Sequence, residues 1–295
     1  MRDVKKIDDN LFDSAESSTS MKEEFPVVAP KAKKRSWGRI VWRIVWITAL
    51  CLLLLAVLPI FLYKWVNPPL TPLMVTRYFQ QLGDSGRQVN FERDYVSLED
   101  ISPHLVDAVV ASEDGRFMHH KGFDVEQLKL SYKENKQGRR MRGGSTISMQ
   151  TAKNAFLPHR RSYLRKALEA GYTIAIEKIW GKERIMEVYL NIVEFGDGIY
   201  GCEAASQHYF GHSAKTLSRH EAAQLAVTLP SPLKRNPAHA TPYFKKRTSA
   251  IESRMAQYGH VNLKKAPTKR KPEDDEDIFD FLRWRKEYEK TTLPK

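Results

Sequence analysis

A run of 20 uncharged and mostly apolar residues, IVWITALCLLLLAVLPIFLY at positions 44–63, restricts the folds open to this chain. At about 1.5 Å per residue, a helix of this length crosses the hydrocarbon layer of a bilayer. A signal peptide has a shorter apolar region and a small-residue cleavage site, and Pro59 to Tyr63 offer no such site. We therefore expect a retained transmembrane anchor over residues 44–65.

The charges and aromatic rings around this run predict its orientation. Basic residues gather just before it, at Lys31, Lys33, Lys34, Arg35, Arg39 and Arg43. Interfacial aromatic residues bracket it, at Trp42, Trp46, Tyr63 and Trp65. Because positive charge marks the cytoplasmic side of a span, the sequence predicts a single-pass protein of the cytoplasmic (inner) membrane. Its N-terminus is expected in the cytoplasm, and everything after the span in the periplasm or outside the cell.

The chain carries a formal net charge of +13, with 48 Lys and Arg against 35 Asp and Glu, which favours anionic partners. Since the folded part is expected outside the cytoplasm, lipid head groups and lipid-linked pyrophosphates are closer partners than nucleic acid. We therefore expect contact with membrane lipid and none with nucleic acid. The two cysteines, Cys51 and Cys202, exclude a disulfide framework and a cysteine-based zinc site.

Composition and periodicity divide the chain into five parts. They are a flexible basic tail at 1–43, the anchor at 44–65, a linker and membrane-proximal segment at 66–100, a main domain at 101–262 and a charged tail at 263–295. Apolar residues of the main domain recur at helical intervals, as in Leu164, Leu168, Gly171, Ala175 and Ile179, so we expect a mainly α fold. The stretch FDFLRWRKEYEK near the C-terminus could form an amphipathic helix that touches a membrane or a partner, but we favour a solvated tail.

Two carboxyl groups stand at the end of an apolar helix within residues 109–124, VVASEDGRFMHHKGFD. Glu113 and Asp114 leave the helix where Gly115 can adopt a left-handed capping conformation. The preceding helical spacing puts one small apolar stripe against the core, with Glu113 beside it. A carboxylate held there has a raised pKa and suits proton abstraction. The alternative is a salt-bridged helix end with its charges in water.

Residues 129–166 carry 11 basic residues against one acid, Glu134, which favours an anionic ligand or surface. Within this region Gly143, Gly144, Ser145 and Thr146 precede a helix, ISMQTAKNAF. Free N–H groups at a helix start, together with hydroxyl groups, suit a phosphate, and Lys153 could close over it. The same four residues also suit an ordinary helix N-cap, and the sequence alone leaves both interpretations open.

A second candidate carboxylate lies on the next helix, which is expected to begin near Ser162. Arg165, Glu169, Thr173 and Glu177 follow one another at intervals of four residues. One interpretation is an exposed row of ion pairs, each worth a few tenths of a kcal/mol. The other is that Arg165 holds Glu169 so that it faces Glu113 across a groove.

Five motifs resemble those of the glycosyltransferases that polymerise bacterial peptidoglycan, in their monofunctional, membrane-anchored form. They occur in the family's order between about 103 and 237, as EDGRFMHHKG, GGSTISMQTAKN, RKALE, KERIMEVYLN and GIYGCEAASQHYFG. The second motif departs from the family at Ser148 and Met149, where Thr and Gln are usual, and the fourth at Met186, where Leu is usual. Gln150 is therefore the only amide at positions 148–150 of its motif.

The resemblance implies a lysozyme-like helical domain that polymerises lipid II into β-1,4-linked glycan. Glu113 is expected to remove the proton from the acceptor's GlcNAc 4-hydroxyl, whose oxygen attacks C1 of the donor MurNAc with inversion and releases undecaprenyl diphosphate. Glu169, the second essential carboxylate, is expected to orient cations or a metal. The expected substrate-binding residues are Asp114, Phe117, His120, Ser145, Thr146, Gln150, Lys153, Asn154, Arg161, Arg165 and Lys166.

The resemblance also implies partners and a cofactor. The partners are lipid II, the growing glycan chain, and proteins of cell-wall synthesis or division. A divalent cation such as Mg²⁺ is expected with the donor pyrophosphate, and no organic cofactor. Two alternatives are a membrane-anchored lytic transglycosylase or muramidase-like enzyme and an inactive scaffold for wall synthesis. The basic cluster and the anchor favour a lipid-pyrophosphate donor over cleavage, and the intact Glu113 and Glu169 argue against a scaffold.

Overall fold

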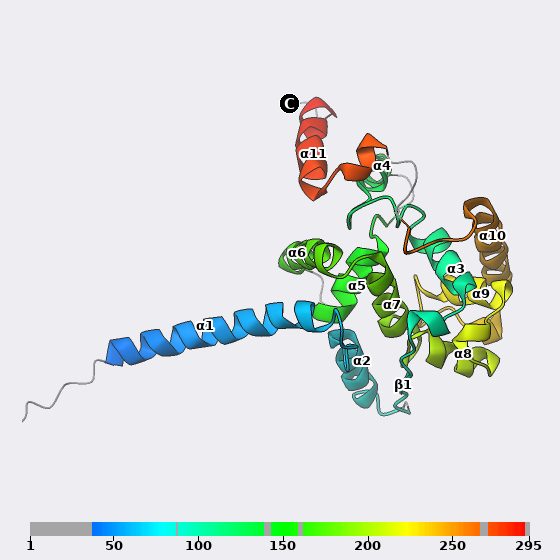
Figure 1. The fold of residues 1–295 in the computed structure, drawn as a ribbon, viewed down its shortest axis with the longest axis horizontal. Helices are drawn as coiled ribbons and strands as arrows, with labels where there is room; N and C mark the ends of the chain where they lie inside the picture. The colour runs from blue at the N-terminus through cyan, green and yellow to red at the C-terminus, as the bar shows by residue number, and fades with distance from the viewer. Residues whose placement is uncertain (1–36, 87, 139–142, 159–161, 266–270, 293–295) are drawn as a thin grey trace, which may run out of the picture. The chain divides into compact units, whose positions relative to one another are not determined.

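The computed structural model describes residues 37–86, 88–138, 143–158, 162–265 and 271–292. The chain divides into two units, residues 1–49 and residues 50–295. The helices of the described residues are α1 (Trp37–Leu62), α2 (Pro72–Leu82), α3 (Pro103–Glu113), α4 (Val125–Lys136), α5 (Ile147–Phe156), α6 (Tyr163–Ile179), α7 (Lys182–Ile192), α8 (Cys202–Phe210), α9 (Arg219–Thr228), α10 (Pro242–Tyr258) and α11 (Ile278–Thr292), with short 3-10 turns between some of them. The predicted mainly α class is confirmed (Figure 1).

Helix α1 contains the predicted apolar run and is long and apolar enough to cross a membrane. Within the described residues the helix extends from Trp37 through this run to Leu62. Its apolar side chains are mostly exposed, as expected for a helix that lipid surrounds. The helix is consistent with a single membrane anchor.

The last turns of α1 belong to the second unit and contact α6. The Tyr172 hydroxyl donates a hydrogen bond to the Ala56 carbonyl (3.1 Å), and Trp180 Nε1 donates to the Ile60 carbonyl (2.6 Å). Ile60 lies in the last turn of α1, where carbonyl groups lack an intrahelical partner. The C-terminal half of α6 therefore lies against the last turns of α1.

Residues 66–100, expected as a linker and membrane-proximal segment, contain helix α2 and strand β1 (Glu92–Arg93). Thr71 caps α2 by accepting a hydrogen bond from the Met74 N–H, and Leu73 and Met74 are buried in the core. Strand β1 pairs with β3 (Ile199–Tyr200), which also pairs with β2 (Glu194–Gly196), giving the order β1-β3-β2. This segment thus contributes packing surface to the helical unit.

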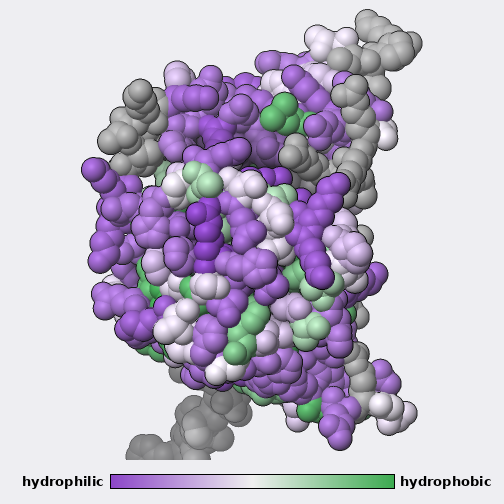
Figure 2. Space-filling model, turned by 90° about the vertical axis from the view of Figure 1, so that its right-hand side faces the viewer, coloured by the Kyte–Doolittle hydropathy of each residue, from purple (hydrophilic) through white to green (hydrophobic). Residues whose placement is uncertain are grey.

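The core of the second unit places the ends of two helices side by side. Helix α3 packs on α9 and α10, and α5 packs on α6 and α7. The side chains of Leu105, Ile147, Tyr189 and Leu225 are fully buried among them. The side of the unit that carries α8, α9 and α10 is mostly hydrophilic, with small and separate apolar patches (Figure 2). The C-terminal end of α3 and the N-terminal half of α5 are consequently held in fixed positions.

Helix α6 turns its polar side inward. Glu169 is 2% exposed and Thr173 is fully buried, whereas Leu164 is 72% exposed and Leu168 is also exposed. The row of residues at intervals of four is therefore not an exposed row of surface ion pairs. Its Glu169 faces the interior of the unit.

Residues 271–292 pack on the domain and differ in this from the favoured solvated tail. A 3-10 turn at Pro272–Asp275 precedes α11, and Asp274 is buried against Arg116 (2.5 Å). Lys129 of α4 pairs with Glu276 (2.8 Å). Acidic residues of this segment thus neutralise basic residues of the domain, which a count of charges along the sequence does not reveal.

Candidate active site

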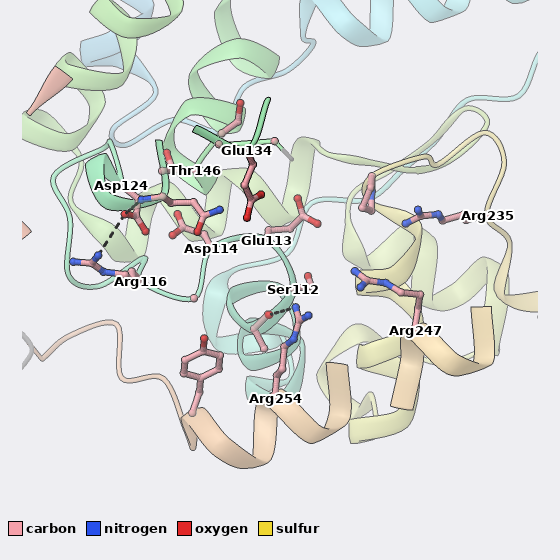
Figure 3. Close-up of a pocket in the computed structure, with 18 of the residues that line it drawn as sticks. Ser112, Glu113, Asp114, Arg116, Asp124, Glu134, Thr146, Arg235, Arg247 and Arg254 are labelled. Carbon is pink, nitrogen blue, oxygen red and sulfur yellow. Dashed lines mark hydrogen bonds and ion pairs between the residues drawn. The ribbon is translucent and has the colours of Figure 1, made fainter. Parts of the chain in front are cut away.

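A cavity of about 820 Å³ opens at the C-terminal end of α3 (Figure 3). One wall comes from residues 111–116 and the turn before α5, and the facing wall from the α9–α10 connection and α10. Glu113, Asp114, Ser145 and Thr146 line it, which brings four of the predicted residues together. The cavity is large enough for a sugar-sized substrate.

Glu113 is the last residue of α3, and its partly buried side chain reaches the cavity. Its Oε2 accepts a hydrogen bond from Gln150 Nε2 (2.9 Å), and Gln150 Oε1 accepts one from the Tyr189 hydroxyl (3.3 Å). Burial raises the pKa of Glu113, while the bond from Gln150 and the charges of Arg235 and Arg247 oppose this rise. The raised pKa expected from the sequence is confirmed.

The end of α3 is not the predicted glycine cap. Asp114 leaves the helical conformation (φ −156°, ψ 73°), and Gly115 does not have a positive φ. A Cβ atom on Gly115 would instead lie 2.7 Å from the Tyr258 hydroxyl of α10, so a larger residue here would displace the Tyr258 side chain. The neighbour of Gly115 is thus a side chain from a distant helix, which local spacing does not encode.

Asp114 links the end of α3 to the start of α5. Its oxygens lie 3.0 Å from His120 Nε2, and it accepts a hydrogen bond from the Ile147 N–H (3.0 Å). Burial opposes ionisation of Asp114, but His120 and the Ile147 N–H together hold the pKa of Asp114 below its usual value. The Gly122 N–H donates a hydrogen bond to His120 Nδ1 (3.1 Å), so in a neutral ring the hydrogen is on Nε2. The Nε2–H group then donates a hydrogen bond to Asp114. His120 thereby holds Asp114 in place at the wall of the cavity.

Two further predicted substrate-binding residues face inward. Phe117 is buried in the core, with Lys182 Nζ 4.4 Å from its ring centre. Asn154 is also buried, and its Oδ1 has no hydrogen-bond partner in the part of the chain that the structure describes. Both lie away from the cavity lining and support the helices that form it.

Of the two hydroxyl residues before α5, Thr146 has a structural role and Ser145 is exposed at the cavity. Thr146 is the N-cap of α5: its hydroxyl accepts from the Met149 N–H (3.2 Å) and donates to the Gly122 carbonyl (2.6 Å). Ser145 is exposed at the cavity. The predicted helix start is therefore present, and Ser145 is the member of the pair whose hydroxyl is open to a ligand.

Glu169 holds two cations on one face of α6. Its Oε2 pairs with Arg165 (2.9 Å) and its Oε1 with Lys166 (2.5 Å). Burial lowers the pKa of Lys153, and the charges of Glu169 and Glu113 oppose this. Lys153 therefore stands in the electrostatic field of both carboxylates, although neither it nor Glu169 lines the cavity. Arg161 lies outside the described residues.

The wall that faces Glu113 consists of residues that the sequence analysis missed. Arg235, Arg247 and Arg254 line the cavity, and Figure 3 shows Arg235 and Arg247 on the side opposite Glu113. Arg235 is fixed by the Val227 carbonyl (2.9 Å), and Arg254 by the Ala111 carbonyl (3.4 Å). The interval of seven residues between Arg247 and Arg254 places them on one face of α10. This spacing is the sequence pattern that could have indicated a shared cationic surface.

The described residues contain no group of three or more His, Cys, Asp or Glu side chains arranged to hold a metal ion. Both oxygens of Glu169 already contact cations, and Asp114 is paired with His120. A divalent ion would thus need most of its oxygen ligands from the phosphates of a substrate. The side chains in the part of the chain that the structure describes do not by themselves fit a resident metal.

Comparison with known proteins places this geometry in a family. The Transglycosylase family model matches residues 80–256. Biosynthetic peptidoglycan transglycosylases are similar to the chain: that of Caulobacter vibrioides is 48% identical over 72% of this chain and 92% of its own length. The Rhodospirillum centenum protein is 51% identical over 66% of this chain and 81% of its own length, and the Marinomonas protein is 45% identical over 79% and 97%. The chain belongs to the transglycosylase family.

Proposed function

We propose that this protein is a peptidoglycan glycosyltransferase that joins lipid II units into glycan strands for the cell wall. Its relatives carry the name biosynthetic peptidoglycan transglycosylase. The observation that carries the proposal is Glu113: a carboxylate with a raised pKa, held by Gln150, at a cavity whose other wall is cationic. A helix that can span a membrane suits a substrate with a lipid tail.

In the proposed reaction Glu113 is the general base. The acceptor's GlcNAc 4-hydroxyl donates its proton to Glu113 as its oxygen attacks C1 of the donor MurNAc. The bond between C1 and the phosphate oxygen breaks, the configuration at C1 inverts, and undecaprenyl diphosphate leaves with the electron pair. Gln150 holds the carboxylate in place, and the raised pKa of Glu113 strengthens it as a base.

The departing pyrophosphate needs positive charge more than it needs a proton, because it is already a good leaving group. Lys153, Arg165 and Lys166 are the cations we assign to it. Glu169 fixes Arg165 and Lys166 through both of its oxygens and so acts as a positioning residue. A divalent cation, if used, would join the substrate phosphates at the same place and neutralise their charge.

We further propose that the N-terminus lies in the cytoplasm and the helical unit on the outer side of the membrane. The basic residues before α1 support this orientation. Lipid II and the growing glycan chain are then reached from the bilayer surface. Proteins of wall synthesis or division are proposed as partners on the basis of the family alone.

The direct test incubates the purified full chain with labelled lipid II in detergent or vesicles and sizes the product. We expect long glycan that lysozyme digests to disaccharide units, which demonstrates β-1,4 linkage. A parallel sample receives isolated peptidoglycan instead. Release of soluble fragments from that sample, without polymer from lipid II, would contradict the proposal and support a lytic enzyme; an inactive scaffold would give neither product.

A further inference from the structure

Helix α11 has two faces, and its inward face is packed. Ile278 and Phe281 lie against the apolar cluster of Phe123, Val125 and Met149. The ring of Trp284 meets Tyr132 of α4 edge to face, with ring centres 5.9 Å apart. The helix is thus a fixed part of the unit in this structure, although its residues lie beyond those that the family model matches.

The outward face of α11 combines apolar and basic side chains. Phe279 is 62% and Leu282 is 42% exposed, and Arg283, Lys286 and Lys290 are exposed beside them. At about 100° per residue, these five side chains fall within an arc of about 100° that contains no acid. Within the described part of the chain, Lys286 and Lys290 have no ion-pair partner, and Arg283 pairs at 3.6 Å with Asp280. This set of five residues is the outer face of α11.

The same apolar cluster joins α11 to a helix that borders the membrane-spanning segment. Ala170 and Ile174 of α6 pack on the cluster together with Ile278 and Phe281. Helix α6 contacts the end of α1 and exposes apolar side chains of its own, with Tyr163 97% exposed. One packed cluster therefore joins the inward face of α11 to α6, the helix that contacts the end of α1.

Chemistry selects the partner for this face. Two exposed apolar side chains bury far less than the roughly 800 Å² per partner of a stable protein interface. They are enough to enter the head-group region of a bilayer, where lysine and arginine side chains reach lipid phosphates. We propose that the outer face of α11 binds the anionic surface of the membrane that α1 crosses. The ion pair between the buried Asp274 and the partly exposed Arg116 then joins the segment before α11 to the rim of the cavity.

The test places an environment-sensitive fluorophore on the full chain in vesicles. In a background of Cys51→Ser and Cys202→Ser, Leu282→Cys is labelled with a nitrobenzoxadiazole dye. The vesicles contain phosphatidylcholine with or without phosphatidylglycerol, and a share of the lipids carries a nitroxide quencher. The matched control is Thr291→Cys, exposed on the same helix about 120° away from the centre of the outer face.

We expect a blue-shifted emission and strong nitroxide quenching at position 282 with the anionic lipid, and neither at position 291. Adding Lys286→Glu and Lys290→Glu should reduce the quenching at position 282 to the level of the control. Equal emission at the two positions, or equal quenching without the anionic lipid, would overturn the proposal. A blue shift that grows with protein density but shows no quenching would also overturn it, since a second copy would then cover the face. The experiment measures fluorescence and not enzymatic activity, so its outcome is independent of the proposed reaction.

Discussion

Replacing Gln150 by Leu should move the acid side of the pH–rate profile upward. Gln150 Nε2 donates to Glu113 Oε2 at 2.9 Å and stabilises the ionised carboxylate. A hydrogen bond to a charged group contributes about 1.5–3 kcal/mol. Because the cavity is open to water we take the lower end, and about 1.4 kcal/mol corresponds to one pKa unit, so the shift is about one pH unit. The base must be unprotonated, so activity is lost as the pH falls through its pKa, and a higher pKa brings that loss at higher pH.

The assay is kcat/KM for labelled lipid II as a function of pH, which reports the free enzyme. Tyr189→Phe is the matched control: it removes the hydroxyl that touches Gln150 Oε1 but leaves the bond between Gln150 and Glu113. Its acid limb should stay close to that of the parent. If the limb of Gln150→Leu is unmoved or shifts to lower pH, then Gln150 does not stabilise a catalytic carboxylate, and the assignment of Glu113 as base loses its main structural support.

Four more predictions follow from contacts at the site. Arg247→Ala should also shift the acid limb upward, but less than Gln150→Leu, because Arg247 has the smaller effect on the pKa of Glu113; a downward shift would contradict this. Lys153→Met should lower kcat for lipid II by about 10²-fold, and parental rates would remove Lys153 from the reaction. Glu169→Gln should move the alkaline limb to lower pH, since Glu169 counteracts the burial that lowers the pKa of Lys153; an unchanged limb would speak against that coupling. Asp114→Asn should reduce the free energy of unfolding by about 1–3 kcal/mol at pH 7. The lowered pKa of Asp114 means that its contribution is present above the usual value of 3.8 and is lost below it, so chemical denaturation should show the difference shrinking in acid, and a constant difference would refute the role.

Local patterns predicted the parts of this protein that depend on neighbours in sequence. The apolar run identified α1, the Gly-Gly-Ser-Thr stretch identified the start of α5, and the stripe on α3 indicated the raised pKa of Glu113. Each of these features follows from helical spacing and chain composition. The motifs then identified the family, which the comparisons confirmed.

The parts that could not be predicted depend on long-range packing or on the surrounding medium. Helix α6 buries Glu169 and exposes Leu164, the reverse of the usual arrangement in water, and its Tyr172 contacts the end of α1. Gly115 lies against Tyr258, which is distant in sequence. Arg247 reaches the cavity only because α10 packs on α3. The C-terminal segment packs on α4 through ion pairs that no local pattern predicts.

The most direct test of the central claim is the rate of glycan polymerisation by Glu113→Gln, measured together with its thermal unfolding. The amide keeps the size of the side chain but cannot accept the proton, so kcat/KM for lipid II should fall by about 10²- to 10⁴-fold. Because burial disfavours the ionised carboxylate, the unfolding temperature at neutral pH should stay the same or rise. A folded variant that polymerises lipid II at the parental rate would contradict the account.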